Sequence, residues 1–349
     1  MYFKHTQLVI IIGLLLSIFI SSSTYAKEST KNPRNSLVNN ADVQKFINEM
    51  STKHSFKKAQ LETLFRQVKI KQKILDAMSR PAERSKAWFE YRKIFLTQKR
   101  IKRGVTFWQE NKDVLAYAEK VYGVAPEIMV AIIGIETYYG KRQGSYRVMD
   151  ALSTLAFKYP KRSKFFRSEL KHFLIMSQEQ KFDPLSKTGS YAGAMGMGQF
   201  IPSSFQSYAI DFDGDGEKNI WTNNSDAIGS VAHYFKRHGW QKGQPVADKL
   251  ALAKENNITA DDACKRSCKP KLTIADFKHK GLQGKTTMSD KAKAILLILK
   301  QQNNKEYWLG YTNFYVISRY NHSTLYSMAV YQLSQEIKSA YQQAEKKAQ

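Results

Sequence analysis

The stretch from Pro126 to Gly140 constrains the fold most, because it has the pattern of a buried helix with one acidic side chain among apolar ones. Proline favours the first position of a helix and glycine the position just past its end, so we expect the helix to fill this interval. With about 100° between successive residues, Glu136 falls on the same face as Met129 and Ile133. The pattern predicts a carboxylate directed into the interior.

A buried carboxylate at this place has two possible uses. Burial disfavours its charged form, and so do the carbonyl groups of the last helical turn, so we expect the pKa of Glu136 to be raised. A raised pKa suits a general acid near neutral pH. The alternative is a structural glutamate satisfied by Lys141, Arg142 or backbone amides. The helix by itself does not decide between the two.

The chain is long enough for two or three domains and is strongly basic. Its 349 residues include 55 Lys and Arg against 30 Asp and Glu, which gives a net charge of +25. A hydrophobic content of 42% is that of a globular protein and excludes a disordered one. The positive charge predicts an acidic partner, whether nucleic acid, anionic lipid or a cell-wall polymer.

The first 26 residues have the pattern of a secretory signal. Lys4 precedes an apolar run at 8–20, and the segment 24–26 ends in Ala26, after which we expect cleavage. The apolar run of 13 residues is short for a membrane span, and an uncleaved inner-membrane anchor is the alternative. No cysteine lies near the cleavage position, so a lipid anchor is not expected. Export to the periplasm argues against nucleic acid and for the cell envelope as the acidic partner.

The chain has two cysteines, Cys264 and Cys268, four positions apart. In an oxidising compartment a local disulfide is the leading interpretation, and free thiols are the alternative. A metal site would need further ligands that the neighbouring sequence does not offer, so none is expected here.

Hydrophobic spacing divides the chain into mostly helical segments. Residues 27–40 are polar and non-periodic, as in a flexible linker, and the tail at 342–349 is expected to fray. Apolar residues recur at helical spacing through 41–125, whereas 241–304 has the short apolar runs typical of small strands. We expect a helical domain over 41–125 completed by 324–341, a core over 126–240 resumed at 305–323, and a β-rich module inserted at 241–304.

A glycine-rich segment lies beyond the core helix. Four glycines fall between Gly189 and Gly198, and such density lets the backbone approach a ligand closely. The segment lacks the Gly-Lys-Ser/Thr ending of a phosphate-binding loop, so a nucleotide site is not expected. Gln199 at its end can offer an amide to a polar ligand, and a purely structural turn is the alternative.

An acidic loop at 211–217 matches the first half of a helix–loop–helix calcium site. Acidic residues occupy loop positions 1, 3 and 5, and a glycine occupies position 6. The glutamate expected at position 12 is replaced by Thr222, and the next carboxylate is Asp226. A metal-free acidic turn is the alternative. The predicted ligands of a structural calcium ion are Asp211, Asp213, Asp215 and the backbone carbonyl of Glu217, with Asp226 as a further candidate.

Together these motifs resemble the membrane-bound lytic murein transglycosylase B family. The resemblance is carried by residues 134–140 and 190–204, by the acidic loop with the segment after Asp226, and by 313–321. It extends over most of the chain from residue 40 to residue 340. The resemblance implies an α+β, predominantly α protein that acts on peptidoglycan. Its expected parts are a lysozyme-like catalytic core, an additional helical domain and a small inserted β domain.

The resemblance also implies a reaction in which one glutamate acts alone, and that residue maps to Glu136. It would protonate the glycosidic oxygen between N-acetylmuramic acid and N-acetylglucosamine. The same carboxylate would then activate the C6 hydroxyl of the sugar and give a 1,6-anhydro end. No catalytic cofactor is implied. A hydrolytic muramidase and a non-catalytic peptidoglycan-binding or scaffold protein are the alternatives.

The family's substrate groove maps onto residues from several parts of the chain. The stem-peptide and lactyl carboxylates of peptidoglycan would account for an acidic partner, and Lys161 and Arg162 are candidates to meet them. Proteins of cell-wall synthesis or division are further candidate partners for what we expect to be a monomer. The implied groove residues are Tyr91, Ser190, Ala192, Met195, Gln199, Phe200, Asn321 and Tyr326.

Two features depart from the family pattern. The missing lipid-attachment cysteine predicts a soluble periplasmic form, or one held by an uncleaved anchor. The interval of 15 positions from Asp211 to Asp226 is one longer than in the family loop, which weakens the case for Asp226 as a ligand.

Overall fold

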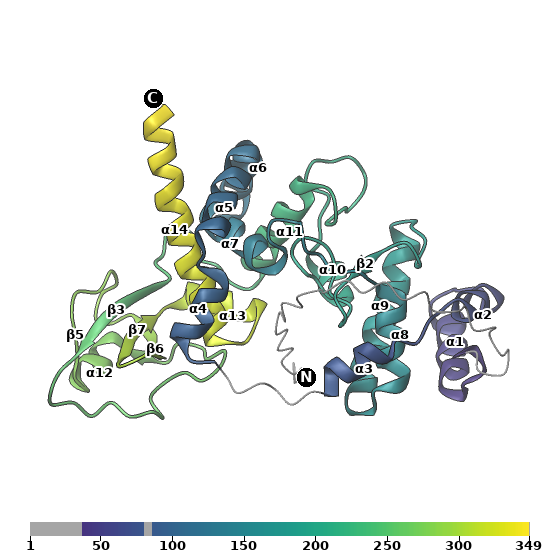
Figure 1. Cartoon of the computed structure of the whole chain (residues 1–349), viewed down its shortest axis with the longest axis horizontal. Coiled ribbons are helices and arrows are strands. Elements are labelled where there is room, and N and C mark those ends of the chain that lie inside the picture. The colour runs from purple at the N-terminus through teal and green to yellow at the C-terminus, as the bar shows by residue number, and fades with distance from the viewer. Residues whose placement is uncertain (1–36, 80–85, 349) are drawn as a thin grey trace, which may run out of the picture.

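A computed structural model describes residues 37–79 and 86–348, so the expected signal at 1–26 lies outside the described residues. Most of this part of the chain is helical, with one five-stranded and one two-stranded sheet (Figure 1). The predominantly α, α+β class is therefore confirmed. Among the helices in these ranges, none combines the length and apolar character needed to span a bilayer.

Most of the helices are short, and the longer strands are concentrated between α11 and α13. The helices are α1 (Ala41–Lys53), α2 (Lys58–Arg66), α3 (Gln72–Ser79), α4 (Trp88–Phe95), α5 (Gln98–Glu110), α6 (Lys112–Tyr122), α7 (Pro126–Thr137), α8 (Val148–Lys158), α9 (Ser163–Glu179), α10 (Pro202–Tyr208), α11 (Asn224–Arg237), α12 (Ile274–His279), α13 (Thr312–Tyr320) and α14 (Thr324–Ala348). Short 3-10 turns lie at Leu37–Asn39 and Pro160–Arg162. The strands are β1 (Tyr146–Arg147), β2 (Thr188–Gly189), β3 (Ala247–Leu252), β4 (Leu272–Thr273), β5 (Leu282–Gln283), β6 (Lys293–Lys300) and β7 (Lys305–Gly310).

The first three helices lie beside α8 and α9 at one end of the molecule (Figure 1). The rings of Phe46 and Phe65 pack edge-on against Phe157 of α8, with centroids 5.9 and 6.1 Å away. The backbone amide of Lys69 donates to the buried carboxylate of Asp150, also on α8, at 2.9 Å. Aromatic packing and a buried acceptor thus fix this group of helices to α8.

Helices α4, α5 and α6 have different neighbours, because they pack around α7, α11 and α14. The structure thus differs from the single helical domain expected over 41–125, which divides into two groups of helices. Helix α14, which contains the segment 324–341, contacts α4, α5 and α7. It also continues as helix to Ala348, whereas we expected 342–349 to fray. Its C-terminal part is supported by Tyr341, whose ring stacks on Trp108 at 4.3 Å.

The β-rich module is one antiparallel sheet with strand order β4-β6-β7-β3-β5. It has a small hydrophobic core of its own, which includes Leu250, Phe277 and Leu296. Because β7 pairs with both β6 and β3, the sheet ends at Gly310 and not at 304 as expected. A disulfide bond joins Cys264 and Cys268 beside β6, where the backbone amide of Cys264 donates to Leu296 at 2.8 Å.

Candidate active site

Helix α7 is buried on every side. All residues from Glu127 to Thr137 are buried, whereas the sequence pattern had indicated one apolar face. The difference arises because α5, α6, α11 and α14 all pack against this helix. Glu136 is directed inward as expected and keeps 8% of its exposure, so it lies at the boundary between the core and the solvent.

The C-terminal end of α7 differs from the expected one. The helix begins at Pro126 as predicted but ends at Thr137, before Gly140. Tyr138, and not a glycine, takes the left-handed conformation that closes the helix, with φ of 53°. A non-glycine residue in this conformation is strained, so the surroundings must hold it there.

Tyr139 supplies that support by folding back over the helix. Its φ is also left-handed, at 60°, and its hydroxyl donates to the backbone carbonyl of Arg100 on α5 at 2.9 Å. A Cβ added to Gly134 would lie 2.6 Å from this tyrosine ring, so only glycine leaves room for it. The turn after Glu136 is therefore locked against α5.

The Glu136 carboxylate has one side-chain hydrogen-bond partner in the described residues, the hydroxyl of Tyr326, which donates to Oε1 at 2.5 Å. Burial raises the pKa of Glu136 to about 7, and the bond from Tyr326 opposes part of that rise. Lys141 and Arg142, considered from the sequence as neutralising partners, are exposed and form no ion pair with it in the described ranges. The carboxyl group can therefore both give and accept a proton near neutral pH.

Two further tyrosines lie close enough to respond to the charge of Glu136. Burial raises the pKa of Tyr91 on α4 and of Tyr320 on α13, and the carboxylate of Glu136 raises both further. Tyr326 belongs to α14, so aromatic side chains from three helices converge on one acid. Tyr91 and Tyr326 were predicted, whereas Tyr320 was missed although it lies inside the quoted 313–321 motif.

The glycine-rich segment forms a tight hairpin beside α7. Met195 and Phe200 exchange both backbone hydrogen bonds at 2.9 Å. Gly196 has a φ of 69°, and a Cβ there would come within 2.6 Å of the carbonyl oxygen of Ile220. Glycine is thus required both for the left-handed turn and for the close approach of a second backbone segment.

Three hydrogen bonds tie this hairpin to its surroundings. The Thr137 hydroxyl at the end of α7 donates to the carbonyl of Met197 at 2.8 Å. The Tyr320 hydroxyl donates to Gly198 at 2.5 Å. The Met197 amide in turn donates to Ile220, just past the acidic loop, at 2.9 Å. The hairpin is therefore held between α7, α13 and the segment that follows the acidic loop.

The expected groove residues divide by exposure. Ala192, Met195 and Phe200 are buried, and Phe200 packs within 6.0 Å of the rings of Tyr234 and Tyr320. Their side chains are core in this structure, so any contact with a ligand has to come from their backbone. Tyr326 is also buried and bonds to Glu136 through its hydroxyl. The half-buried members are Tyr91, Ser190, Gln199 and Asn321.

Three half-buried groove residues already have partners inside the protein. Gln199 donates its side-chain amide to the carbonyls of Gln143 and Gly196, at 3.2 and 3.1 Å. The Ser190 hydroxyl accepts from the Ala194 amide at 3.0 Å. The Asn321 side chain accepts from a backbone amide just before α14. These bonds fix the side chains in place and leave part of their hydrogen-bonding capacity for a ligand.

Lys161 and Arg162 lie on the 3-10 turn between α8 and α9. The Arg162 guanidinium lies over the rings of Phe165 and Phe166, at 4.3 and 5.2 Å, and burial lowers its pKa. Packing against aromatic rings supports a structural role for Arg162. Lys161 is exposed.

The acidic loop brings three predicted ligands together. Oxygen atoms of the Asp211, Asp213 and Asp226 carboxylates all lie within 4.8 Å of one another. Asp226, whose interval had weakened its case, is fully buried on α11. It accepts hydrogen bonds from the amides of Phe212 and Asn219 at 2.7 and 2.6 Å, so the loop is folded around this carboxylate.

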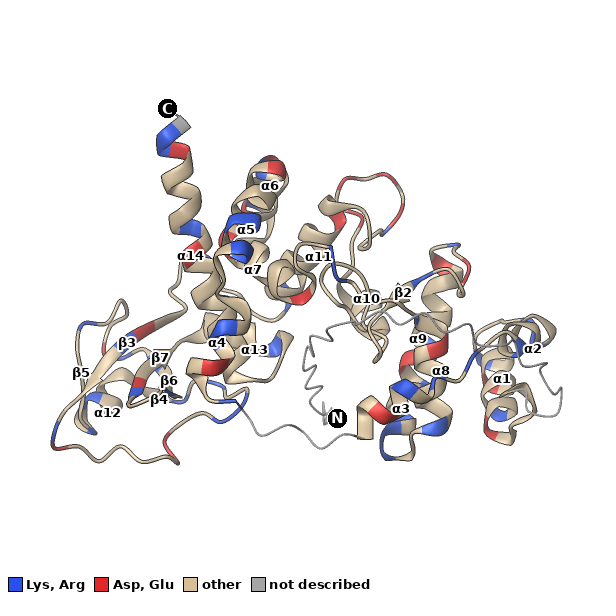
Figure 2. Cartoon of the chain, viewed as in Figure 1, with Lys and Arg blue, Asp and Glu red and all other residues tan. Residues whose placement is uncertain are grey.

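The remaining predicted ligands lie outside that group. The Asp215 carboxylate is exposed and accepts from the backbone amide of Glu217 at 2.9 Å. The red segment beside α11 in Figure 2 shows how acidic the loop is within a basic protein. Three carboxylates held this close repel one another, and an oxygen-only donor set suits a hard cation such as Ca²⁺. The residues present therefore fit a calcium ion.

Residues 39–335 match the family model described as transglycosylase SLT domain. The chain is 43% identical over 308 residues to the membrane-bound lytic murein transglycosylase B of Escherichia coli strain K12. That alignment covers 86% of this chain and 83% of the relative.

Solved structures share the fold. The soluble lytic transglycosylase SltB1 of Pseudomonas aeruginosa has a TM-score of 0.82 and 52% identity, covering 86% of this chain and 99% of that one. The Escherichia coli lytic transglycosylase Slt35, in complex with calcium, has a TM-score of 0.80 and 43% identity, covering 87% and 94%. SltB3 of Pseudomonas aeruginosa, in complex with NAG-anhNAM-pentapeptide, has a TM-score of 0.77 and 27% identity, covering 85% and 79%.

Proposed function

The chain belongs to the transglycosylase SLT domain family and is a peptidoglycan lytic transglycosylase with a lysozyme-like fold, and on that premise we propose that Glu136 performs both of its proton transfers. The observation that carries the proposal is a buried carboxyl group whose pKa is raised to about 7 and whose side-chain partner is a tyrosine hydroxyl. Near neutral pH such a group is available in both its protonated and its ionised form.

Two other buried glutamates are less suited to the role. Glu127, at the other end of α7, forms an ion pair with Lys338 at 2.8 Å. Glu169 on α9 accepts from the backbone amide of Ser203 at 3.0 Å, at the start of α10. Glu127 is thus used in an ion pair and Glu169 in a bond to the start of α10. Glu136, in contrast, lies beside the glycine-rich hairpin and three tyrosines.

In the first step protonated Glu136 gives its proton to the glycosidic oxygen of the leaving N-acetylglucosamine. The bond from that oxygen to C1 of N-acetylmuramic acid breaks, and positive charge develops at C1. The ionised carboxylate then stabilises this charge electrostatically.

In the second step ionised Glu136 takes the proton from the C6 hydroxyl of the same muramic acid residue. The freed oxygen bonds to C1, which closes the 1,6-anhydro ring and returns the acid to its protonated form. No water is consumed, so one carboxyl group completes the cycle. Tyr326 stabilises the ionised intermediate form by donating its hydroxyl proton to Oε1.

Digestion of purified sacculi, followed by mass measurement of the released fragments, tests this assignment. We expect fragments that are lighter by one water than hydrolytic products, and no release by Glu136→Gln. Glu127→Gln is the matched control, since it removes another buried carboxylate from the same helix. Products with the mass of hydrolysis would identify a muramidase instead, and release by Glu136→Gln would refute the assigned residue.

For the acidic loop we propose a structural calcium site held by the carboxylates of Asp211, Asp213 and Asp226, with Asp215 and the carbonyl of Glu217 completing it. The cluster of three carboxylates and the calcium complex of Slt35 support this site. A bound cation would offset the repulsion between the carboxylates and would stiffen the segment that supports the hairpin through Ile220.

We further propose that the protein is exported and acts in the periplasm. The basic charge, the signal pattern at 1–26 and the peptidoglycan fragments bound by SltB3 support this location and an anionic cell-wall substrate. The remaining members of the expected groove, Ser190, Gln199 and Asn321, would hold hydroxyl and acetamido groups of the glycan.

A further inference from the structure

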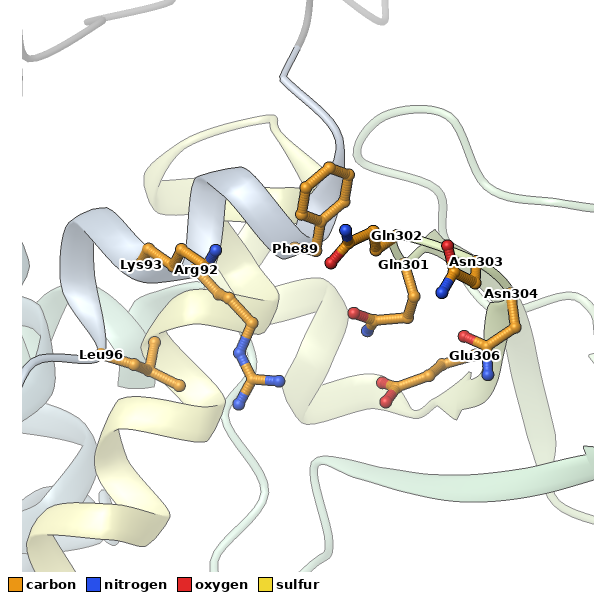
Figure 3. Close-up of a pocket in the computed structure, with 9 residues that line it drawn as sticks. All are labelled: Phe89, Arg92, Lys93, Leu96, Gln301, Gln302, Asn303, Asn304 and Glu306. Carbon is orange, nitrogen blue, oxygen red and sulfur yellow. The ribbon is translucent and has the colours of Figure 1, made fainter.

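A second groove, whose lining does not include Glu136, lies against α4. It has a volume of about 550 Å³ and lies between α4 and the turn at 301–304 that joins β6 to β7 (Figure 3). The helix contributes Phe89, Arg92 and Lys93, and the turn contributes four consecutive carboxamide side chains. The groove therefore combines an aromatic ring, positive charge and amide groups.

Helix α4 carries two stripes of side chains, one toward Glu136 and one toward the groove. Trp88 and Phe95 are buried, and Tyr91 between them lies close enough to Glu136 to feel its charge. Phe89 and Arg92 are three residues apart, on the adjacent stripe of the helix, which faces the groove. A ligand in the groove would thus contact the same helix that places Tyr91 in the catalytic site.

The protein offsets part of the positive charge of the groove: against the effect of burial, the bonds from Lys249 and Trp308 and the charges of Lys249 and Arg92 lower the pKa of Glu306. Within the described residues neither Arg92 nor Lys93 forms an ion pair with a carboxylate. The acid that lines the groove, Glu306, is already paired with Lys249 at 2.8 Å and accepts from the Trp308 indole at 3.1 Å. The arginine therefore retains its capacity to bind an external carboxylate.

The four carboxamide side chains at 301–304 are not needed to close the turn. The turn itself is closed by a backbone hydrogen bond from the Gln301 amide to the Asn304 carbonyl at 2.9 Å. The side-chain nitrogen of Gln301 is buried and has no hydrogen-bond partner in the described part of the chain. Figure 3 shows this side chain between Arg92 and Glu306. A buried donor without a partner is costly, so the site gains from a ligand that accepts from it.

We propose that this groove binds an acidic peptide, namely a stem peptide of the peptidoglycan on which the enzyme acts. Arg92 would bind a carboxylate of the peptide, Gln301 would donate to a peptide carbonyl, and the Phe89 ring would cover an aliphatic side chain. The proposal rests on the proposed function for the identity of the polymer. It adds a peptide-binding site, separate from the carboxyl group that cleaves the glycan.

Calorimetric titration of the full chain with a synthetic stem pentapeptide tests the site. The free-carboxylate peptide should bind, and its fully amidated form should bind about tenfold more weakly, as expected for loss of a charge-assisted contact. Arg92→Gln should lose about tenfold in affinity for the acidic peptide, and Arg92→Lys should recover part of it. Gln301→Leu should weaken binding about threefold.

Arg66→Gln is the matched control, because it removes the same charge from an exposed position on α2 and should bind like the wild type. Melting curves of all variants establish that they are folded. The proposal that the groove binds the peptide is refuted if Arg92→Gln binds as tightly as the wild type. It is also refuted if the wild type does not bind the peptide at millimolar concentration. Release of anhydro fragments by the wild type is measured in parallel, so failure of the groove and failure of the enzyme assignment are distinguished.

Discussion

Replacing Glu136 by glutamine should stabilise the protein, and the gain should grow with pH. The carboxyl group is buried and its pKa is raised from an ordinary value of 4.5 to about 7, chiefly by burial. In the unfolded chain the same group ionises freely near its ordinary value. Folding therefore requires Glu136 either to keep a proton or to bury a charge, and both cost free energy.

The two pKa values set the size and the pH window of this cost. A difference between 4.5 and about 7 corresponds to about 3 kcal/mol, since one pK unit is worth about 1.4 kcal/mol. The folded form binds more protons than the unfolded form in this interval, so wild-type stability falls as pH rises from 4.5 to about 7. Below the interval the group is neutral in both states and adds no cost.

The test is to measure the free energy of unfolding of the wild type and of Glu136→Gln in urea, at several pH values from 4.5 to above 7. The variant should match the wild type at the acidic end and exceed its free energy of unfolding by up to about 3 kcal/mol above neutrality. Glu127→Gln, which breaks the ion pair with Lys338, should instead lose stability at neutral pH. A pH-independent difference between wild type and Glu136→Gln would refute the raised pKa, and with it the argument for a neutral-pH acid.

The other predictions concern Tyr326, which is the hydrogen-bond partner of Glu136, the acidic loop at 211–217 and the signal pattern at 1–26. Tyr326→Phe removes the donor to Glu136 and should raise its pKa further, moving the alkaline limb of the pH–rate profile up by about one unit. Tyr331 lies on the same helix as Tyr326, and its hydroxyl donates to the carbonyl of Ala247 in β3, so Tyr331→Phe should leave the limb in place. Chelation of calcium should lower the melting temperature by about 5 °C, and Asp213→Ala should abolish that response; identical melting curves would count against an occupied site. If the proposed signal is cleaved, the protein recovered from cells should begin at Lys27, whereas an intact N-terminus would support the uncleaved anchor.

Local sequence patterns predicted the elements that depend on near neighbours. Pro126 begins α7 as its chemistry requires, and Glu136 is buried as the periodicity indicated. The class of fold followed from the helical spacing and from the family resemblance. The end of α7 was predicted wrongly, because Tyr139 folds back onto Arg100, and a contact between α7 and α5 cannot be found in the sequence of either helix alone.

Domain boundaries failed for the same physical reason. Residues 41–125 repeat one helical pattern, yet α1–α3 pack on α8 and α4–α6 pack around α7, α11 and α14. Amphipathic spacing says that a helix has an apolar face and does not say which partner covers it. The β-rich module was expected to end at 304, but β7 extends it to Gly310. Strand β7 is defined by its pairing with β6 and β3, which the local sequence does not reveal.

Glu136, the proposed catalytic residue, could be found from the local sequence, but its raised pKa could not. Its raised pKa depends on the helices that bury α7 and on Tyr326, which lies 190 positions away along the chain. Tyr91 and Tyr320 reach the same carboxyl group from α4 and α13. Because α4 also lines the second groove, a peptide bound to Arg92 would bear on the helix that carries Tyr91. On the proposed assignments, α4 would contact both the carboxyl group that cleaves the glycan and the peptide that the groove binds.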